Sequence, residues 1–107
     1  MILEVASLHV RDGQACDFET AFRDAQRIIA STPGYISHEL GRCLERPNEF
    51  ILLVRWQSLD AHEIGFRKSP EYQTWKQLLH HFYHPFPVVS HYAQVKDATG
   101  GASACEI

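Results

Sequence analysis

One short segment, residues 50–57 (FILLVRWQ), restricts the fold of this chain more than any other. As a β-strand it would point Ile51 and Leu53 to one face. The opposite face would carry the larger apolar side chains Phe50, Leu52, Val54 and Trp56. A strand that is apolar on both faces must be covered on both. In a chain of 107 residues its own helices can cover one face only, so the second face predicts contact with a partner subunit.

Along the chain, segments with the two-residue apolar repeat of strands alternate with segments that have the 3.6-residue apolar repeat of helices. The predicted strands span 2–10, 35–43, 50–57 and 87–95, and the predicted helices span 14–31, 58–66 and 70–82. Ser69-Pro70 is a helix start signal between the last two helical segments. We treat these two segments together as the second helix of the fold. The order β-α-β-β-α-β predicts an α+β, ferredoxin-like fold with a four-stranded antiparallel sheet in the order 4-1-3-2. Both helices would cover one face of this sheet.

The composition of the C-terminal stretch indicates where the domain ends, and the net charge and the length of the apolar runs argue against several kinds of partner. We expect one domain over 1–95 and a flexible tail over 96–107, which is Gly-rich and almost without bulky apolar groups. A net charge of −3 argues against nucleic acid as a partner. No apolar run approaches the ~20 residues of a membrane span.

Cysteine usage points to a reducing compartment. The chain has three cysteines, far apart and never in a C-x-x-C arrangement: Cys16, Cys43 and Cys105. This pattern indicates neither a disulfide framework nor a zinc site. We therefore expect reduced thiols in a cytoplasmic protein.

The imidazoles and aromatic rings are concentrated in the last third of the chain. Of seven histidines, five lie between residues 62 and 91: His62, His80, His81, His84 and His91. His80 and His84 are four residues apart, which would suit two metal ligands, but no third ligand stands at ligand spacing. The alternative is that these imidazoles interact with the dipole at a helix C-terminus. We predict no metal site.

Short motifs at the turns and strand ends carry more specific information. They are Arg11-Asp12-Gly13, Pro33-Gly34-Tyr35, Ser37-His38-Glu39-Leu40, Arg46-Pro47-Asn48-Glu49-Phe50, Trp56-Gln57-Ser58, Ser69-Pro70-Glu71-Tyr72 and Val89-Ser90-His91-Tyr92. Over nearly the whole of residues 2–95, this set resembles the antibiotic biosynthesis monooxygenase family. The resemblance implies a dimeric α+β barrel, in which two ferredoxin-like subunits form a homodimer through the sheet face.

The resemblance also implies an activity. Family members include oxygenases that use no cofactor and act on quinols and other phenolic aromatics with dioxygen, and relatives that degrade haem. The haem-degrading relatives carry an Asn on the first strand, which is absent here. They also carry a Trp where Gly65 or Phe66 stands here and a His at or next to the position of Trp75. We therefore expect a cofactor-independent monooxygenase of a small phenolic or quinol compound. The alternative is a non-catalytic or isomerising small-molecule binder on the same barrel.

Such an oxygenation needs a base and flat apolar walls. The candidate base or hydrogen-bond donor is His62. Many relatives carry a histidine at the position of Gly65, and His62 lies about one helical turn before that position. The candidate walls are Trp56, Phe66, Tyr72 and Trp75. The alternative is that these rings are ordinary core aromatics and that His62 is solvated or capped.

A second group of polar residues lies on the first and last strands. Residues of like parity on two antiparallel strands can share a face of the sheet. We therefore expect a polar patch, in the pocket or in the subunit interface, that consists of Ser7, His9 and His91. We include Ser7 and His91 among the candidate substrate-binding residues. Arg55 and Arg67 are the cations available to an anionic substrate, or are simply solvated.

Overall fold

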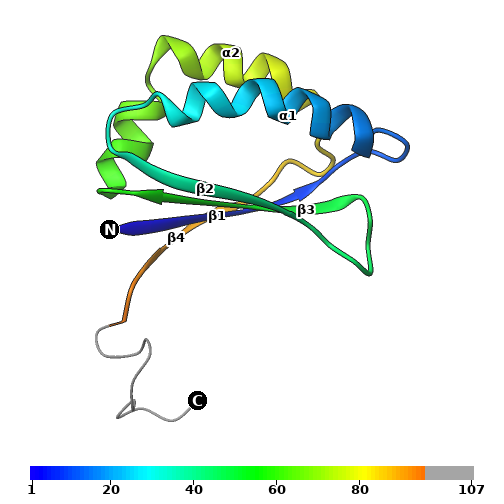
Figure 1. The fold of residues 1–107 in the computed structure, drawn as a ribbon, viewed down its shortest axis with the longest axis horizontal. Coiled ribbons are helices and arrows are strands. Elements are labelled where there is room, and N and C mark those ends of the chain that lie inside the picture. The colour runs from blue at the N-terminus through cyan, green and yellow to red at the C-terminus, as the bar shows by residue number, and fades with distance from the viewer. Residues whose placement is uncertain (96–107) are drawn as a thin grey trace.

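The computed structural model describes residues 1–95 as one antiparallel sheet with its helices on one face (Figure 1). The predicted tail, 96–107, lies outside the described residues. The strands are β1 (Ile2–His9), β2 (Tyr35–Arg42), β3 (Glu49–Trp56) and β4 (Val89–Ala93), and the helices are α1 (Ala15–Ala30), η1 (Ala61–Phe66), α2 (Pro70–Leu79) and η2 (His80–Phe82). The sheet order is β2-β3-β1-β4 with antiparallel neighbours throughout. The predicted ferredoxin-like fold is confirmed.

Each helix forms where the sequence places an apolar stripe and a stop signal. The buried side of α1 consists of residues three and four apart: Ala15, Phe18, Phe22, Ala25 and Ile29. The side chain of Ser69 accepts a hydrogen bond from the backbone N–H of Tyr72, and Pro70 occupies the first turn of α2, as predicted. Neither α1 nor α2 is long and apolar enough to cross a membrane, and the same holds for every helix within residues 1–95.

The segment between β3 and α2 departs from the expected α-helix. The hydroxyl of Ser58 accepts the N–H of Ala61, and the chain then makes a wide π-helical turn over η1. In this turn the N–H of Arg67 donates to the carbonyl of His62, five residues back, at 3.0 Å. Single π-helical turns of this kind are rare in proteins overall, but those that occur are often found at functional sites.

The last elements are shorter than predicted. The helix predicted over 70–82 is interrupted after Leu79 and ends as the short η2, and β4 pairs only over Val89–Ala93 instead of 87–95. Pro87 has no N–H to donate to β1, which is a reason for the late start of β4.

The two faces of the sheet differ as the sequence of β3 predicts. Side chains at even positions of β3 lie under the helices and are almost fully buried, whereas Ile51 on the other face is 43% exposed. Tyr92 of β4 is 56% exposed. Figure 1 shows both long helices on one side of the sheet and no helix of residues 1–95 on the other. The uncovered face therefore carries apolar side chains that residues 1–95 do not bury.

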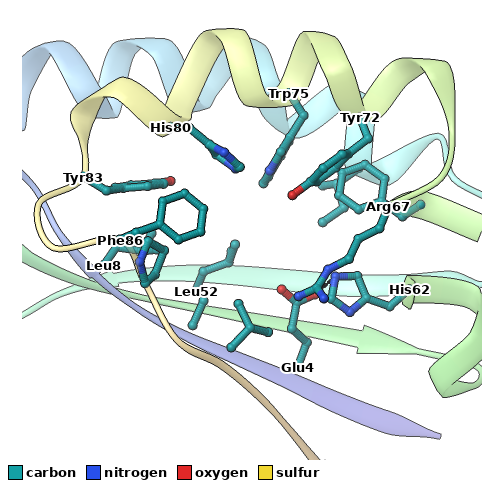
Figure 2. A pocket seen from close by; sticks show the side chains of 15 residues that line it. Glu4, Leu8, Leu52, His62, Arg67, Tyr72, Trp75, His80, Tyr83 and Phe86 are labelled. Carbon is teal, nitrogen blue, oxygen red and sulfur yellow. Dashed lines mark ion pairs between the residues drawn. The ribbon is translucent and has the colours of Figure 1, made fainter. Parts of the chain in front are cut away.

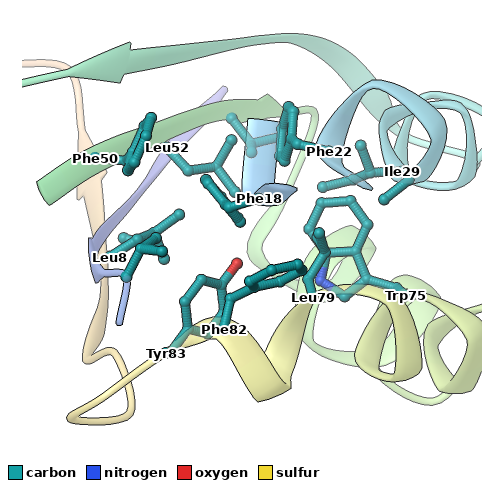
Figure 3. Close-up of a cluster of buried hydrophobic side chains, with 14 of the residues drawn as sticks. Leu8, Phe18, Phe22, Ile29, Phe50, Leu52, Trp75, Leu79, Phe82 and Tyr83 are labelled. Carbon is teal, nitrogen blue, oxygen red and sulfur yellow. The ribbon is translucent and has the colours of Figure 1, made fainter. Parts of the chain in front are cut away.

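The core under α1 is built from aromatic rings (Figure 3). Phe18 is fully buried and packs edge-on against Phe50, with ring centroids 4.9 Å apart. It contacts Phe82 and Tyr83 in the same way at 5.7 and 5.8 Å. Edge-to-face contacts at these distances are the preferred geometry for aromatic pairs.

Candidate active site

A cavity of about 380 Å³ lies between the sheet and α2 (Figure 2). Its floor is the helix-facing side of β1 and β3, and its walls are rings from η1, α2 and the segment before β4. The lining residues are Glu4, Ala6, Leu8, Ile29, Leu52, His62, Phe66, Arg67, Tyr72, Trp75, His80, Tyr83, Phe86, Pro87 and Val89. This volume falls within the range of small-molecule sites, ~300–1,000 Å³.

Four of the residues proposed from the sequence line this cavity: His62, Phe66, Tyr72 and Trp75. Phe66 packs edge-on against Tyr72 and Trp75, with centroids 5.1 and 5.5 Å apart. These contacts bring η1 and α2 together around one hollow. The wide turn of η1 leaves both His62 and Phe66 buried, at 2% exposure each.

Two further candidates stand behind the cavity wall. The ring of Trp56 stacks on the ring of His62, with centroids 5.2 Å apart and planes inclined by 22°. His91 contacts the far side of His62 from β4, and its Nε2 lies 2.8 Å from Nδ1 of His62. Neither Trp56 nor His91 is among the lining residues. Each contacts His62, which does line the cavity, and can affect a ligand only through such a neighbour.

Ser7 lies on the other face of the sheet, and the expected patch of Ser7, His9 and His91 does not form. His91 pairs across the ladder with Glu4, an even position of β1, whereas Ser7 pairs with Ile51 of the uncovered face. Side chains of successive residues alternate sides, so Ser7 and His91 point in opposite directions. His9 instead lies 3.5 Å from the carboxylate of Glu49.

The sequence reasoning missed Glu4, which is the central polar residue of the cavity. Glu4 shares a face of β1 with Ala6 and Leu8 and is only 5% exposed. A signal was present, because an acidic residue on the apolar side of a strand needs partners. Its partners, Trp56 and His62, come from segments more than 50 residues away and cannot be read from local spacing.

The polar groups around Glu4 form a continuous chain. The indole N–H of Trp56 donates to Oε1 of Glu4 at 2.9 Å. Nε2 of His62 lies 3.3 Å from the same oxygen. Nδ1 of His62 then meets His91. Both of these contacts of the Glu4 carboxyl group use Oε1, so within residues 1–95 Oε2 is the oxygen available to a ligand.

Burial determines the proton affinities of this pair. Burial raises the pKa of Glu4, while the hydrogen bond from Trp56 and the charge of Arg67 act in the opposite direction. Burial also lowers the pKa of His62 to about 3, and the charges of Arg67 and His91 contribute in the same direction. His62 is therefore a neutral imidazole near pH 7, and its 3.3 Å contact with Glu4 is not an ion pair between two full charges.

The opposite end of the cavity is also polar. His80 and Tyr83 line it together with the ring of Phe86, whereas Tyr72 lies nearer to Arg67 and Glu4. Figure 2 shows the hydroxyl groups of both tyrosines directed into the hollow. Burial raises the pKa of both Tyr72 and Tyr83, so these hydroxyls keep their protons. Within residues 1–95 neither hydroxyl makes a hydrogen bond to the protein. Both are therefore available to a ligand.

The remaining histidines do not form a metal centre. His81 and His84 are exposed, whereas His80 lines the cavity. Over the part of the chain that the structure describes, no group of three or more His, Cys, Asp or Glu side chains is arranged to hold a metal ion.

Comparison with known proteins agrees with this architecture. The sequence profile of the family described as "Antibiotic biosynthesis monooxygenase" matches residues 1–78. The uncharacterized Bacillus subtilis protein YczJ is 50% identical over 95 residues, which cover 89% of this chain and 100% of YczJ. The chain therefore belongs to the antibiotic biosynthesis monooxygenase family.

Solved structures show the same fold. A structure from Bordetella bronchiseptica, assigned to the antibiotic biosynthesis monooxygenases, aligns with a TM-score of 0.84 and 32% identity over 88% of this chain and 96% of that chain. SnoaB of Streptomyces nogalater, a cofactor-independent oxygenase, aligns with a TM-score of 0.75 over 92% of this chain and 96% of SnoaB. Its identity is 20%, so this likeness concerns the fold alone.

Proposed function

We propose that this protein is a cofactor-independent monooxygenase that oxidises a small phenolic or quinol-type compound with dioxygen. One observation carries the proposal. A buried carboxyl group, Glu4, is held by His62 and Trp56 at one end of a ring-lined cavity, and one of its oxygens remains available. A phenol bound there would meet a base, flat apolar walls and the cation of Arg67 in one hollow.

In this proposal the Glu4–His62 pair is the base. Oε2 of Glu4 accepts the phenolic proton while His62 holds Oε1. Burial that raises the pKa of Glu4 makes it a stronger base than an exposed carboxylate, and this narrows the gap to a phenol pKa of about 10. The guanidinium of Arg67 lines the same cavity and stabilises the phenolate that forms.

The phenolate then reacts with dioxygen without any further redox partner. A ring carbon gives up electrons to dioxygen and forms a C–O bond, and the resulting peroxide takes back the proton from Glu4. The O–O bond breaks as the same carbon loses its hydrogen, so that one oxygen atom stays as a carbonyl and the other leaves as water. All four electrons that reduce dioxygen come from the substrate, which ends as a hydroxyquinone or its tautomer.

The cavity favours a compact substrate with oxygen functions at two ends. Glu4, Arg67 and the free hydroxyl of Tyr72 occupy one end, and the free hydroxyl of Tyr83 occupies the other. Phe66 and Trp75 supply the apolar walls between them. A quinol of one or two rings matches this arrangement.

We further propose that the protein is a cytoplasmic homodimer that pairs through the uncovered sheet face. The exposed apolar side chains Ile51 and Tyr92 support pairing, and the free thiols of Cys16 and Cys43 are consistent with a reducing compartment. Size-exclusion chromatography with light scattering should give twice the subunit mass, and Ile51→Glu should give one subunit mass. A monomeric wild-type protein would contradict this part of the proposal.

Oxygen uptake tests the activity directly. With purified protein and a panel of one- and two-ring quinols, at least one quinol should consume one dioxygen per quinone formed, and ¹⁸O₂ should label the product once. A metal chelator should leave the rate unchanged. If no quinol supports uptake while one of them raises the melting temperature, the protein is a binder and the oxygenase proposal is wrong.

Replacement of His62 tests the base. His62→Ala should abolish turnover of the quinol found in the panel, because Glu4 loses the partner that orients it. Unchanged turnover would remove His62 from the site. His81→Ala, which changes an exposed histidine outside the cavity, is the matched control.

A further inference from the structure

The edge strand β4 contributes one side chain to the polar chain behind the cavity. His91 is half-buried and pairs with Glu4 across the β1–β4 ladder. Its Nε2 lies 2.8 Å from Nδ1 of His62, and the two rings have centroids 5.0 Å apart. His91 does not line the cavity, so any effect that it has on a ligand passes through His62.

The direction of the hydrogen bonds in this chain follows from its one unambiguous donor. An indole N–H only donates, so Oε1 of Glu4 is an acceptor toward Trp56. With Glu4 ionised, the same oxygen can only accept, so Nε2 of His62, 3.3 Å away, carries the proton that faces it. A neutral imidazole has one N–H, so Nδ1 of His62 is an acceptor. The donor to Nδ1 is then Nε2–H of His91.

We infer that His91 is a positioning residue that fixes the tautomer of His62 and thereby keeps Oε1 of Glu4 hydrogen-bonded as a carboxylate, with Oε2 free for the substrate. The inference rests on the proposed function for what Glu4 does in turnover, but the tautomer is a property of the free protein. Outer partners that orient a functional histidine in this way are a general device in active sites.

Loss of His91 would remove the reason for this tautomer. With no donor at Nδ1, His62 can place its proton there and turn the lone pair of Nε2 toward Glu4. Two acceptors would then face each other, and Glu4 would be driven to hold a proton. The other groups that face the pair would remain, namely Trp56 from β3, Arg67 after η1 and Tyr72 from α2. A protonated Glu4 cannot act as the base, so the acidic limb of the rate profile would move to higher pH.

Nitrogen NMR of the free protein tests the tautomer without any substrate. In protein labelled with ¹⁵N-histidine, long-range ¹H–¹⁵N spectra near pH 7 should show His62 with a protonated Nε2 and an unprotonated Nδ1. The signals are assigned by their loss in His62→Gln. A protonated Nδ1 on His62 in the wild-type protein would overturn the inference, whatever the activity measurements give.

Variants of His91 test its consequence for turnover. His91→Gln keeps an N–H donor near the position of Nε2, whereas His91→Phe keeps a ring without one. We expect His91→Phe to move the acidic limb of kcat/KM upward by about one pH unit or more, to leave KM nearly unchanged at high pH, and to change the His62 nitrogen pattern. His91→Gln should restore both, and His81→Phe, at an exposed site, should alter neither.

The outcomes separate this inference from the proposed function. An unchanged profile and an unchanged His62 nitrogen pattern in folded His91→Phe would refute the positioning role. If no quinol is turned over but the nitrogen pattern changes as expected, the tautomer assignment stands and the oxygenase proposal fails. Should His91→Phe not fold, the wild-type nitrogen pattern and His91→Gln still decide the matter.

Discussion

The helix-covered face of the sheet has two ends that use similar residues in opposite ways. Under α1, the rings of Phe18, Phe50 and Phe82 fill the space between helix and sheet by edge-on contacts. Under α2, the rings of Phe66 and Trp75 stand around a hollow of about 380 Å³. Figure 2 shows the side chains around the cavity, and Figure 3 shows those of the aromatic cluster.

The difference between the two ends has identifiable causes. At the core end the rings of Phe18, Phe50 and Phe82 carry no polar group and meet directly. The cavity end contains Glu4 on β1 and His62 in the wide turn of η1, both almost fully buried. Buried polar groups need partners in fixed positions, and satisfying them leaves space that close-packed apolar residues would fill. We therefore expect the core end to determine stability and the cavity end to determine activity.

The largest effect on stability should come from the core end. Phe18→Ala removes a fully buried ring from the centre of the aromatic cluster and should lower the free energy of unfolding by about 3–5 kcal/mol. Urea denaturation measures it. At the cavity end, Tyr72→Phe removes only a hydroxyl that has no partner within residues 1–95, and should change stability by about 0.5 kcal/mol or less. Equal losses in the two variants would contradict the division between the two ends.

The largest effect on activity should come from Glu4. Glu4→Gln keeps the shape and removes the base, so kcat/KM should fall by about 10²–10⁴-fold. Stability should be unchanged or higher, because burying an ionised carboxyl group costs free energy. Glu63→Gln, at an exposed position of η1, is the matched control for both measurements. A Glu4→Gln protein with full activity would remove Glu4 from the chemistry.

A smaller effect is expected at the turn that supports η1. Gly34 has φ +89°, and a Cβ there would lie 2.6 Å from Cβ of Ala61 at the start of η1. Gly34→Ala should therefore cost about 1–3 kcal/mol and also reduce activity, since η1 carries His62. Gly13 has φ +77° but nothing within 4 Å of an added Cβ. Gly13→Ala should cost less than Gly34→Ala and leave activity intact, and the reverse order would be inconsistent with this role for Gly34.

The smallest effect concerns the dependence of stability on pH. Burial lowers the pKa of His38, His62 and His80 in the folded protein. Below pH 6.5 the unfolded chain then binds more protons than the folded protein, so the free energy of unfolding should fall as the pH falls from 6.5 to 4.5. The raised pKa of Glu4 acts with the opposite sign over the same range.

Chemical denaturation at several pH values resolves these contributions. His62→Gln should make the fall with pH shallower, and Glu4→Gln should make it steeper. The exposed variant His81→Gln should reproduce the wild-type slope. Identical slopes in all four proteins would show that neither Glu4 nor His62 changes its proton affinity on folding.

Much of the fold was predictable because local patterns determine it. The apolar residues of β3 on two faces, the helical stripe of α1 and the Ser69-Pro70 start of α2 each specify an element without reference to the rest of the chain. The sheet order then follows from the order of these elements. The π-helical turn of η1 was not predicted, since its wider hydrogen-bond spacing leaves the same apolar pattern as an α-helix.

The site was predictable only where it depends on rings. His62 and the aromatic walls lie in one segment, and their spacing indicates a common side. Glu4 was missed because its partners come from β3 and η1, and the face that Ser7 occupies was misjudged because parity across a sheet depends on the pairing register. A one-residue change of register exchanges the two faces, and the sequence does not specify it.

A carbon NMR titration of Glu4 tests the central claim of this account most directly, namely that the cavity end holds a base whose proton affinity burial has raised. In protein with ¹³C-labelled glutamate, the carboxyl signal that disappears in Glu4→Gln is followed against pH in the absence of any ligand. We predict a midpoint above the ordinary value of 4.5. A midpoint at or below 4.5 would contradict the account.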